Sequence, residues 1–197
     1  METPSRLSGP HSAGHFFAAR AARMLTMPIE AIVSCACLAV FVGLVLFAAL
    51  SDIATMEIPN WVSIAVAALF PLAALLAHLS PLQISLHVAV GLVVFLAGFG
   101  FFALGILGGG DVKVIAAASI WTGAAAFSPF TLATALAGGA LAFVMIVARR
   151  TTGPSDSHPA FLNRLLNPQN GIPYAVAIAA GVIASLPAQP IVRALLG

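Results

Sequence analysis

Long apolar stretches separated by short polar segments make up most of the chain after about residue 29. A helix needs about 20 predominantly apolar residues, with a range of about 17–25, to cross a bilayer. We expect six such helices, of which the fourth is short, at residues 29–50, 61–79, 86–107, 112–127, 130–148 and from about 172 onward. Pro187 and Pro190 should kink or fray the sixth. The pattern predicts an all-α fold, a polytopic membrane helix bundle.

Composition supports this prediction. Of the 197 residues, 61% are hydrophobic and only 7% are charged, whereas roughly a quarter are charged in soluble domains. The formal net charge of +2 and the lack of a basic block exclude a typical nucleic-acid partner. We therefore expect a polar N-terminal tail at residues 1–28, followed by a membrane-embedded domain at 29–197 in contact with the lipid bilayer.

Cysteine and histidine positions predict no metal and no cofactor. Cys35 and Cys37 lie two residues apart in an apolar run, which suits neither a zinc site nor a structural disulfide. We interpret both as core or lipid-facing residues. The five histidines are expected in tail and loop positions, without a cluster at metal-ligand spacing.

Two aspartates stand where the apolar chain turns around. Asp52 follows the first predicted span, and Asp111 precedes the fourth, in a run of three glycines and an aspartate. A carboxylate kept at the edge of a hydrocarbon segment is costly and is therefore a functional-site hypothesis. Because two spans separate them, both aspartates should emerge on the same side of the membrane. The polar loop at 149–171 should lie on that side too.

Basic residues indicate which side this is. The aspartate side carries Lys113, Arg149, Arg150 and Arg164, and the two short loops opposite carry no lysine or arginine. The positive-inside rule then places the aspartates in the cytoplasm. Four arginines oppose this assignment: Arg6, Arg20, Arg23 and Arg193. A start at Met24 or Met27 would remove the first three of them, and we expect the cytoplasmic orientation.

Two carboxyl groups facing one cavity suit peptide hydrolysis. Like charges at close range repel, so the pair shares a proton. The ionised partner can then activate a water, while the protonated partner hydrogen-bonds to the scissile carbonyl. Gly108 and Gly110 should permit unusual backbone angles and close approach of a substrate, and Asp111 could cap the fourth helix. On spacing alone, an equally good reading is that both aspartates are solvated helix ends.

Other polar residues surround the two aspartates in the sequence. Pro59 and Asn60 are predicted to form a turn and the N-cap of the second helix. Lys113 is either a charge partner or, as we favour, an interfacial anchor. Glu57 is expected to be an exposed loop carboxylate rather than part of the site.

These segments resemble the prepilin peptidases, membrane aspartic proteases with a G-x-G-D motif. The motif here is Gly108-Gly109-Gly110-Asp111, followed by Val112-Lys113, and the other family aspartate corresponds to Asp52 with Ile58-Pro59-Asn60 downstream. The segment from Ile172 to Gly181 resembles the last helix of the short, CpaA/TadV-like peptidases of Flp (type IVb) pilus systems. The resemblance covers about residues 30–185.

The resemblance implies an aspartic endopeptidase of the inner membrane with Asp52 and Asp111 as the catalytic pair. Its substrate would be a prepilin or pseudopilin with a basic leader and a hydrophobic helix, cut at the cytoplasmic face. The insert with two CxxC pairs found in the long, bifunctional relatives is missing, so N-methylation is not expected. Two other functions stay open: a proton-coupled transporter or channel component, and a non-enzymatic pilus or secretion assembly subunit.

Overall fold

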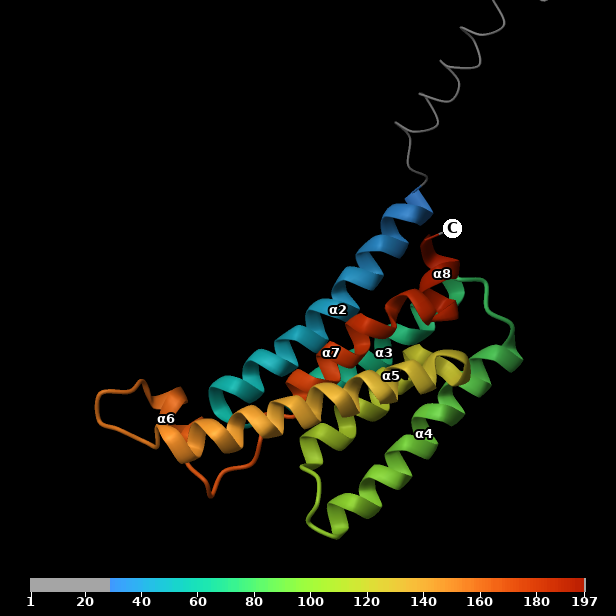
Figure 1. Cartoon of the computed structure of the whole chain (residues 1–197). Coiled ribbons are helices and arrows are strands. Elements are labelled where there is room, and N and C mark those ends of the chain that lie inside the picture. The colour runs from blue at the N-terminus through green and yellow to red at the C-terminus, as the bar shows by residue number, and fades with distance from the viewer. Residues whose placement is uncertain (1–28, 197) are drawn as a thin grey trace, which may run out of the picture.

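The computed structural model describes residues 29–196, and every regular element in that range is helical. In chain order they are α2 (Ile29–Thr55), α3 (Asn60–Leu76), α4 (Pro81–Ala103), α5 (Gly109–Thr151), α6 (Ala160–Leu166), α7 (Ala175–Ser185), the 3₁₀ turn η1 (Leu186–Ala188) and α8 (Pro190–Leu196). The protein is a polytopic helix bundle, as predicted (Figure 1). The predicted tail at 1–28, with its arginines and both alternative start methionines, lies outside the described residues.

Helix α5 is two helices joined at a break. Gly123 has φ 56° and ψ −176°, a conformation that is essentially restricted to glycine. The two arms, 109–122 and 124–151, correspond to the predicted fourth and fifth spans, but the turn expected at Ser128–Pro129 was placed too late. Pro129 lies inside the second arm, where it costs the helix one backbone hydrogen bond. Glycine, rather than proline, therefore reverses the chain.

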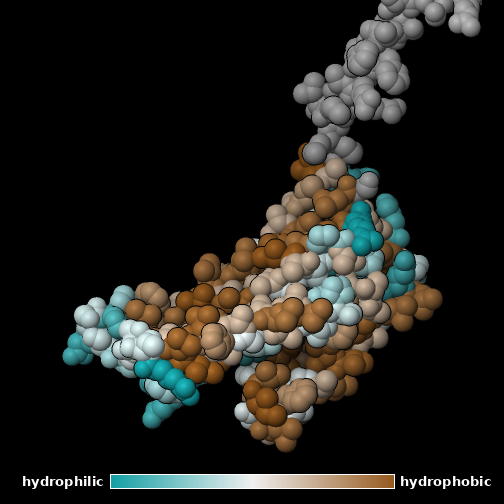
Figure 2. Space-filling model, viewed as in Figure 1, coloured by the Kyte–Doolittle hydropathy of each residue, from teal (hydrophilic) through white to brown (hydrophobic). Residues whose placement is uncertain are grey.

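In the described part of the chain, six helical segments run along the bundle: α2, α3, α4, the two arms of α5 and the bent pair α7–α8. Of these elements, α2, α4 and α5 are long and apolar enough to cross a membrane, and the bent pair α7–α8 raises the number to four. This pair bends by 61°, which confirms the kink predicted at Pro187 and Pro190. Helix α3 has only 17 residues. Figure 2 shows apolar residues along the body and polar residues at its two ends, one at α6 and the other near α8.

The ends of α4 are set by local sequence. Ser80 and Gln83 form a capping box, in which each side chain accepts a hydrogen bond from the other residue's backbone N–H. The helix therefore begins at Pro81 rather than near residue 86. At its other end Gly105, with φ 72°, and Ile106 donate to the carbonyls of Phe102 and Phe101, a Schellman arrangement. It ends α4 four residues earlier than predicted and turns the chain toward the glycine run.

An aromatic cluster at the centre of the bundle joins α2, α3 and α5. Trp121 is fully buried, stacks on Phe41 at 4.1 Å between ring centroids and meets Phe70 edge-on at 6.2 Å. Its indole N–H donates to the Val66 carbonyl at 3.0 Å, so its one polar group is paired, as burial requires. This cluster holds the first arm of α5 against α2 and α3.

His87 contradicts the expectation that the histidines lie in tails and loops. It is buried within α4, and its Nδ1 donates to the Ile120 carbonyl at 2.7 Å, since a carbonyl oxygen can only accept. Its ring also lies against Gly123, where an added Cβ would be 2.5 Å from His87 Cε1. The side chain therefore fastens α4 to α5 at the break.

Replacing Gly123 by alanine should destabilise the bundle, because alanine is strained at this φ and its methyl group would meet the His87 ring. We expect a loss of at least about 1–3 kcal/mol in unfolding free energy from backbone strain, measured by denaturant titration in detergent micelles. Gly139→Ala is the matched control. It lies in the second arm of α5 with nothing within 4 Å of the added Cβ, and it should be neutral or stabilising by about 0.5–1 kcal/mol. Equal stability of the two variants would contradict the strained break.

Candidate active site

One polar pocket at an end of the bundle contains both aspartates. Its volume is about 870 Å³. Its walls come from the end of α2, the turn before α5, both ends of α5, α6 and the segment between α6 and α7. The lining residues include Asp52, Asp111, Arg149, Arg164, Asn170, Ile172 and Tyr174. Span counting predicted that the Asp52 segment, the Asp111 segment and the 149–171 loop share one side, and the structure brings all three together.

Asp52 lies in the last turn of α2, which continues to Thr55, rather than after the helix as predicted. Only 6% of the residue is exposed. Its Oδ2 accepts a hydrogen bond of 3.0 Å from the backbone N–H of Ala175, the first residue of α7. The carboxyl group therefore satisfies one of the free N–H groups at the start of that helix, and the interpretation of Asp52 as a solvated helix end is wrong.

Asp111 is the third residue of α5, and Gly108, not Asp111, occupies the N-cap position. The prediction that Asp111 caps the helix is therefore wrong. Asp111 is half-buried, and its Oδ1 is buried without a hydrogen-bond partner among the described residues. A buried carboxyl oxygen without a partner is costly, so it is available to a group that enters the pocket.

The glycines act through close approach and not through unusual angles. Gly108 has an ordinary extended conformation, with φ −70° and ψ 141°, and positive φ values occur elsewhere. A Cβ at Gly108 would lie 2.8 Å from Asp111 Oδ2, and one at Gly110 would lie 3.2 Å from Ile58 Cβ. Gly110 thus lets the segment after Asp52 pass beside the start of α5. Gly108 therefore does not adopt the unusual backbone angles that we expected, and these glycines can shape the site only by leaving room for neighbouring atoms.

Both aspartates also line a smaller pocket of about 310 Å³, together with Glu57, Asn60 and the glycine run, whereas Pro59 and Lys113 lie outside its lining. Pro59 is the N-cap residue of α3 and Asn60 its first helical residue, so the helix begins one residue earlier than predicted. The Lys113 ammonium donates to Asn60 Oδ1 at 2.7 Å, so Lys113 links α5 to α3. Glu57 is exposed, as expected, but it also lines this pocket with the two aspartates.

The 149–171 loop is held in place by two arginines. Arg149 donates through Nε to the Leu165 carbonyl at 2.8 Å and through Nη2 to the Gly171 carbonyl at 2.7 Å. Arg164, in α6, donates to the Ala54 carbonyl at 2.9 Å. These contacts fasten the loop, which contains a short helix that the sequence pattern did not indicate, over the ends of α5 and α2.

Tyr174 is a pocket residue that the sequence reasoning did not single out as functional. Its ring lies against Gly138, where a Cβ would be 2.6 Å from Tyr174 Cε2. Burial raises the pKa of the Tyr174 hydroxyl, and the charge of Asp111 raises it further, so the hydroxyl stays a hydrogen-bond donor at neutral pH. Two features of the sequence could have pointed to Tyr174: it is the only tyrosine of the chain, and it directly precedes an apolar helix.

A sequence comparison identifies the family. A model described as the type IV leader peptidase family matches residues 39–143, more than half of the chain.

The chain belongs to the type IV leader peptidase family.

The leader peptidase match contains both Asp52 and Asp111. It ends before Arg149, α6 and α7, so the remaining pocket walls come from a part of the chain beyond the match. No curated protein and no solved structure matched the chain. Together with the apolar helices, family membership establishes a membrane protein related to peptidases.

Cysteine labelling can check that the pocket segments share one side of the membrane. In a background with Cys35 and Cys37 replaced by alanine, Ala54→Cys and Ser155→Cys should react with an impermeant thiol reagent from the same side, since both residues are exposed around the pocket end. His78→Cys, in the exposed turn between α3 and α4, should react from the opposite side. Labelling of Ala54→Cys and Ser155→Cys from opposite sides would contradict the arrangement.

Proposed function

We propose that this protein is an aspartic endopeptidase that removes the leader peptide from a prepilin-like substrate at the membrane surface. The observation that carries the proposal is that Asp52, which is buried, and Asp111, which is half-buried, come from distant parts of the sequence and line the same pocket. Family membership favours this activity over a transporter or an assembly subunit.

The two carboxyl groups have different surroundings, which suggests different roles. Asp52 accepts the Ala175 N–H at the start of α7, and a hydrogen bond of this kind favours the charged form of a carboxyl group. Asp111 leaves one oxygen buried and without a partner among the described residues, which favours the neutral form. In this proposal Asp52 is the general base and Asp111 holds the shared proton.

Hydrolysis then follows from proton transfers within the pair. Asp52 removes a proton from a water as the water oxygen bonds to the scissile carbonyl carbon, and Asp111 gives its proton to the carbonyl oxygen. In the resulting diol, Asp52 returns its proton to the amide nitrogen, one hydroxyl proton passes to Asp111, and the C–N bond breaks. One water is consumed, a carboxylic acid and an amine leave, and the pair recovers its starting protonation.

Orientation and substrate type belong to the same proposal. The pocket end carries Lys113, Arg149, Arg150 and Arg164, which by the positive-inside rule favours the cytoplasmic side of the inner membrane. The segment from Ile172 to Gly181, which resembles the short Flp-pilus peptidases, supplies Ile172 and Tyr174 to the pocket. We therefore assign a Flp-like prepilin as the substrate class.

Asp52→Asn and Asp111→Asn should each abolish cleavage while the protein still accumulates in the membrane. Asparagine keeps the size of aspartate but cannot act as the base or carry the shared proton, so the rate should fall by at least about 10²–10⁴. The readout is conversion of a tagged prepilin, followed by gel shift with the purified enzyme in detergent. Glu57→Gln, an exposed carboxyl at the rim, should cleave at close to the wild-type rate. Near-normal cleavage by either asparagine variant would refute the catalytic pair.

The reaction product should carry an unmethylated N-terminus, because the two CxxC pairs that accompany methylation in the long relatives are missing from this sequence. The pair mechanism also predicts processing in the presence of a strong chelator. Mass spectrometry of the pilin released by the purified enzyme, incubated with and without a methyl donor, measures the first expectation. An added mass of one methyl group would show that the methylation prediction is wrong.

A further inference from the structure

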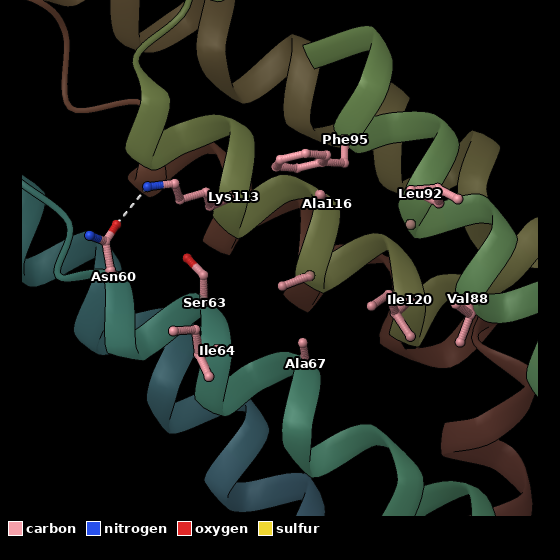
Figure 3. Close-up of a pocket in the computed structure, with 12 residues that line it drawn as sticks. Asn60, Ser63, Ile64, Ala67, Val88, Leu92, Phe95, Lys113, Ala116 and Ile120 are labelled. Atoms are coloured by element: carbon pink, nitrogen blue, oxygen red, sulfur yellow. Dashed lines mark hydrogen bonds between the residues drawn. The ribbon is translucent and has the colours of Figure 1, made fainter. Parts of the chain in front are cut away.

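A second cavity, mostly apolar, lies between α3, α4 and α5. Its volume is about 540 Å³, within the range of ligand pockets, about 300–1,000 Å³. The lining residues recur at helical spacing on each element: Asn60, Ser63, Ile64 and Ala67 on α3, Val88, Gly91, Leu92 and Phe95 on α4, and Lys113, Ala116, Ala117 and Ile120 on α5 (Figure 3). We call this cavity the α3–α5 groove.

One end of the groove adjoins the small pocket that contains the two aspartates. Asn60 lines both the groove and the small pocket that contains Asp52 and Asp111. Lys113 lies two residues after Asp111 and hydrogen-bonds to Asn60. From this shared end, each helical stripe extends over seven residue positions, or about 10 Å at 1.5 Å per residue. The groove therefore runs about two helical turns away from the candidate catalytic pair.

The chemistry of the groove changes along its length. Its polar end is formed by Asn60 and Lys113, whose side chains meet in Figure 3, and small residues such as Ala67, Ala117 and Gly91 continue from there. Small residues let helices approach closely inside a membrane. Ser63 is 7% exposed, and its hydroxyl is buried without a hydrogen-bond partner among the described residues. A helix can therefore pack closely against the groove, and the Ser63 hydroxyl is available there for a hydrogen bond.

One side of the groove is open. Ile64 is 66% exposed and Leu92 is 55% exposed, although both line the cavity. Both belong to apolar helices, so at membrane depth this side faces lipid. An occupant can then enter sideways from the bilayer, and a helix is suited to do so because its backbone groups are already paired.

We propose that the α3–α5 groove binds the first two turns of the substrate's apolar helix, directly after the bond that is cut. The inference rests on the proposed function, which puts the scissile bond between Asp52 and Asp111. A substrate held there has its next residues at Asn60 and Lys113, and the groove continues from these residues along the membrane. This is recognition of a helix by a groove, in which the apolar face of the helix packs into the groove. The groove then binds the apolar helix of the substrate, and the polar pocket binds its leader.

Photo-crosslinking tests the occupant directly. Benzoylphenylalanine replaces Ile64, at the open edge of the groove, in an Asp111→Asn enzyme co-expressed with tagged prepilin in membranes. We expect a covalent adduct that mass spectrometry maps to the first two turns of the substrate's apolar helix. The control replaces Leu136, 67% exposed on the second arm of α5, and should give no such adduct. Adducts with phospholipid alone at position 64, or equal prepilin adducts at both positions, would overturn the proposal.

Filling the groove gives an independent test in active enzyme. Ala67→Phe should raise KM for prepilin at least about tenfold, the effect of losing the burial of one apolar side chain, with little change in kcat. Ala135→Phe, at an exposed position on α5, should keep the wild-type KM.

Equal KM values for the two folded variants would refute the docking site. The peptidase assignment would stand in that case, provided that the wild-type enzyme cleaves prepilin. Failure of the wild-type enzyme to cut prepilin at all would instead refute the proposed function.

Discussion

The hydrogen bond from the Ala175 N–H to Asp52 Oδ2 joins two residues 123 positions apart, and the pocket depends on it. It sets the direction of the Asp52 carboxyl group and holds the start of α7 against the end of α2. From that point α7 runs along the second arm of α5, where Gly181 meets Thr134 and Gly138 meets Tyr174. The same contact that pairs a buried carboxyl oxygen therefore also brings the tyrosine into the pocket.

Several polar side chains at this end of the molecule are paired with backbone carbonyls. Arg149, Arg164 and Ser51 all donate to carbonyl oxygens at turns or helix ends. Such contacts use up the carbonyls that helix ends leave free and leave the aspartates without a neutralising cation bonded to them in the described part of the chain. Asp111 Oδ1 is buried without a hydrogen-bond partner among the described residues, so a group that enters the pocket can bond to it.

Sequence reasoning predicted the bundle and the shared side of the aspartates because both follow from counting apolar stretches. It placed Asp52 beyond a helix that in fact includes it, since the polar run after Leu50 looked like a loop. It put the α5 turn at Ser128–Pro129, because a proline is a visible breaker and a lone glycine is not. Arg149 and Tyr174 were missed as pocket residues because only the folding of distant segments brings them beside Asp111.

The short helices have a consequence for the lipid around them. With 17 residues, α3 spans about 26 Å at 1.5 Å per residue, less than the roughly 30 Å hydrocarbon thickness of a bilayer. The first arm of α5, which packs beside it, is shorter still. A bilayer responds to such a mismatch by thinning locally. Such thinning draws headgroups and water down toward Asn60 and Asp111, so the hydrolysis that we propose at this end of the protein needs no dedicated water channel.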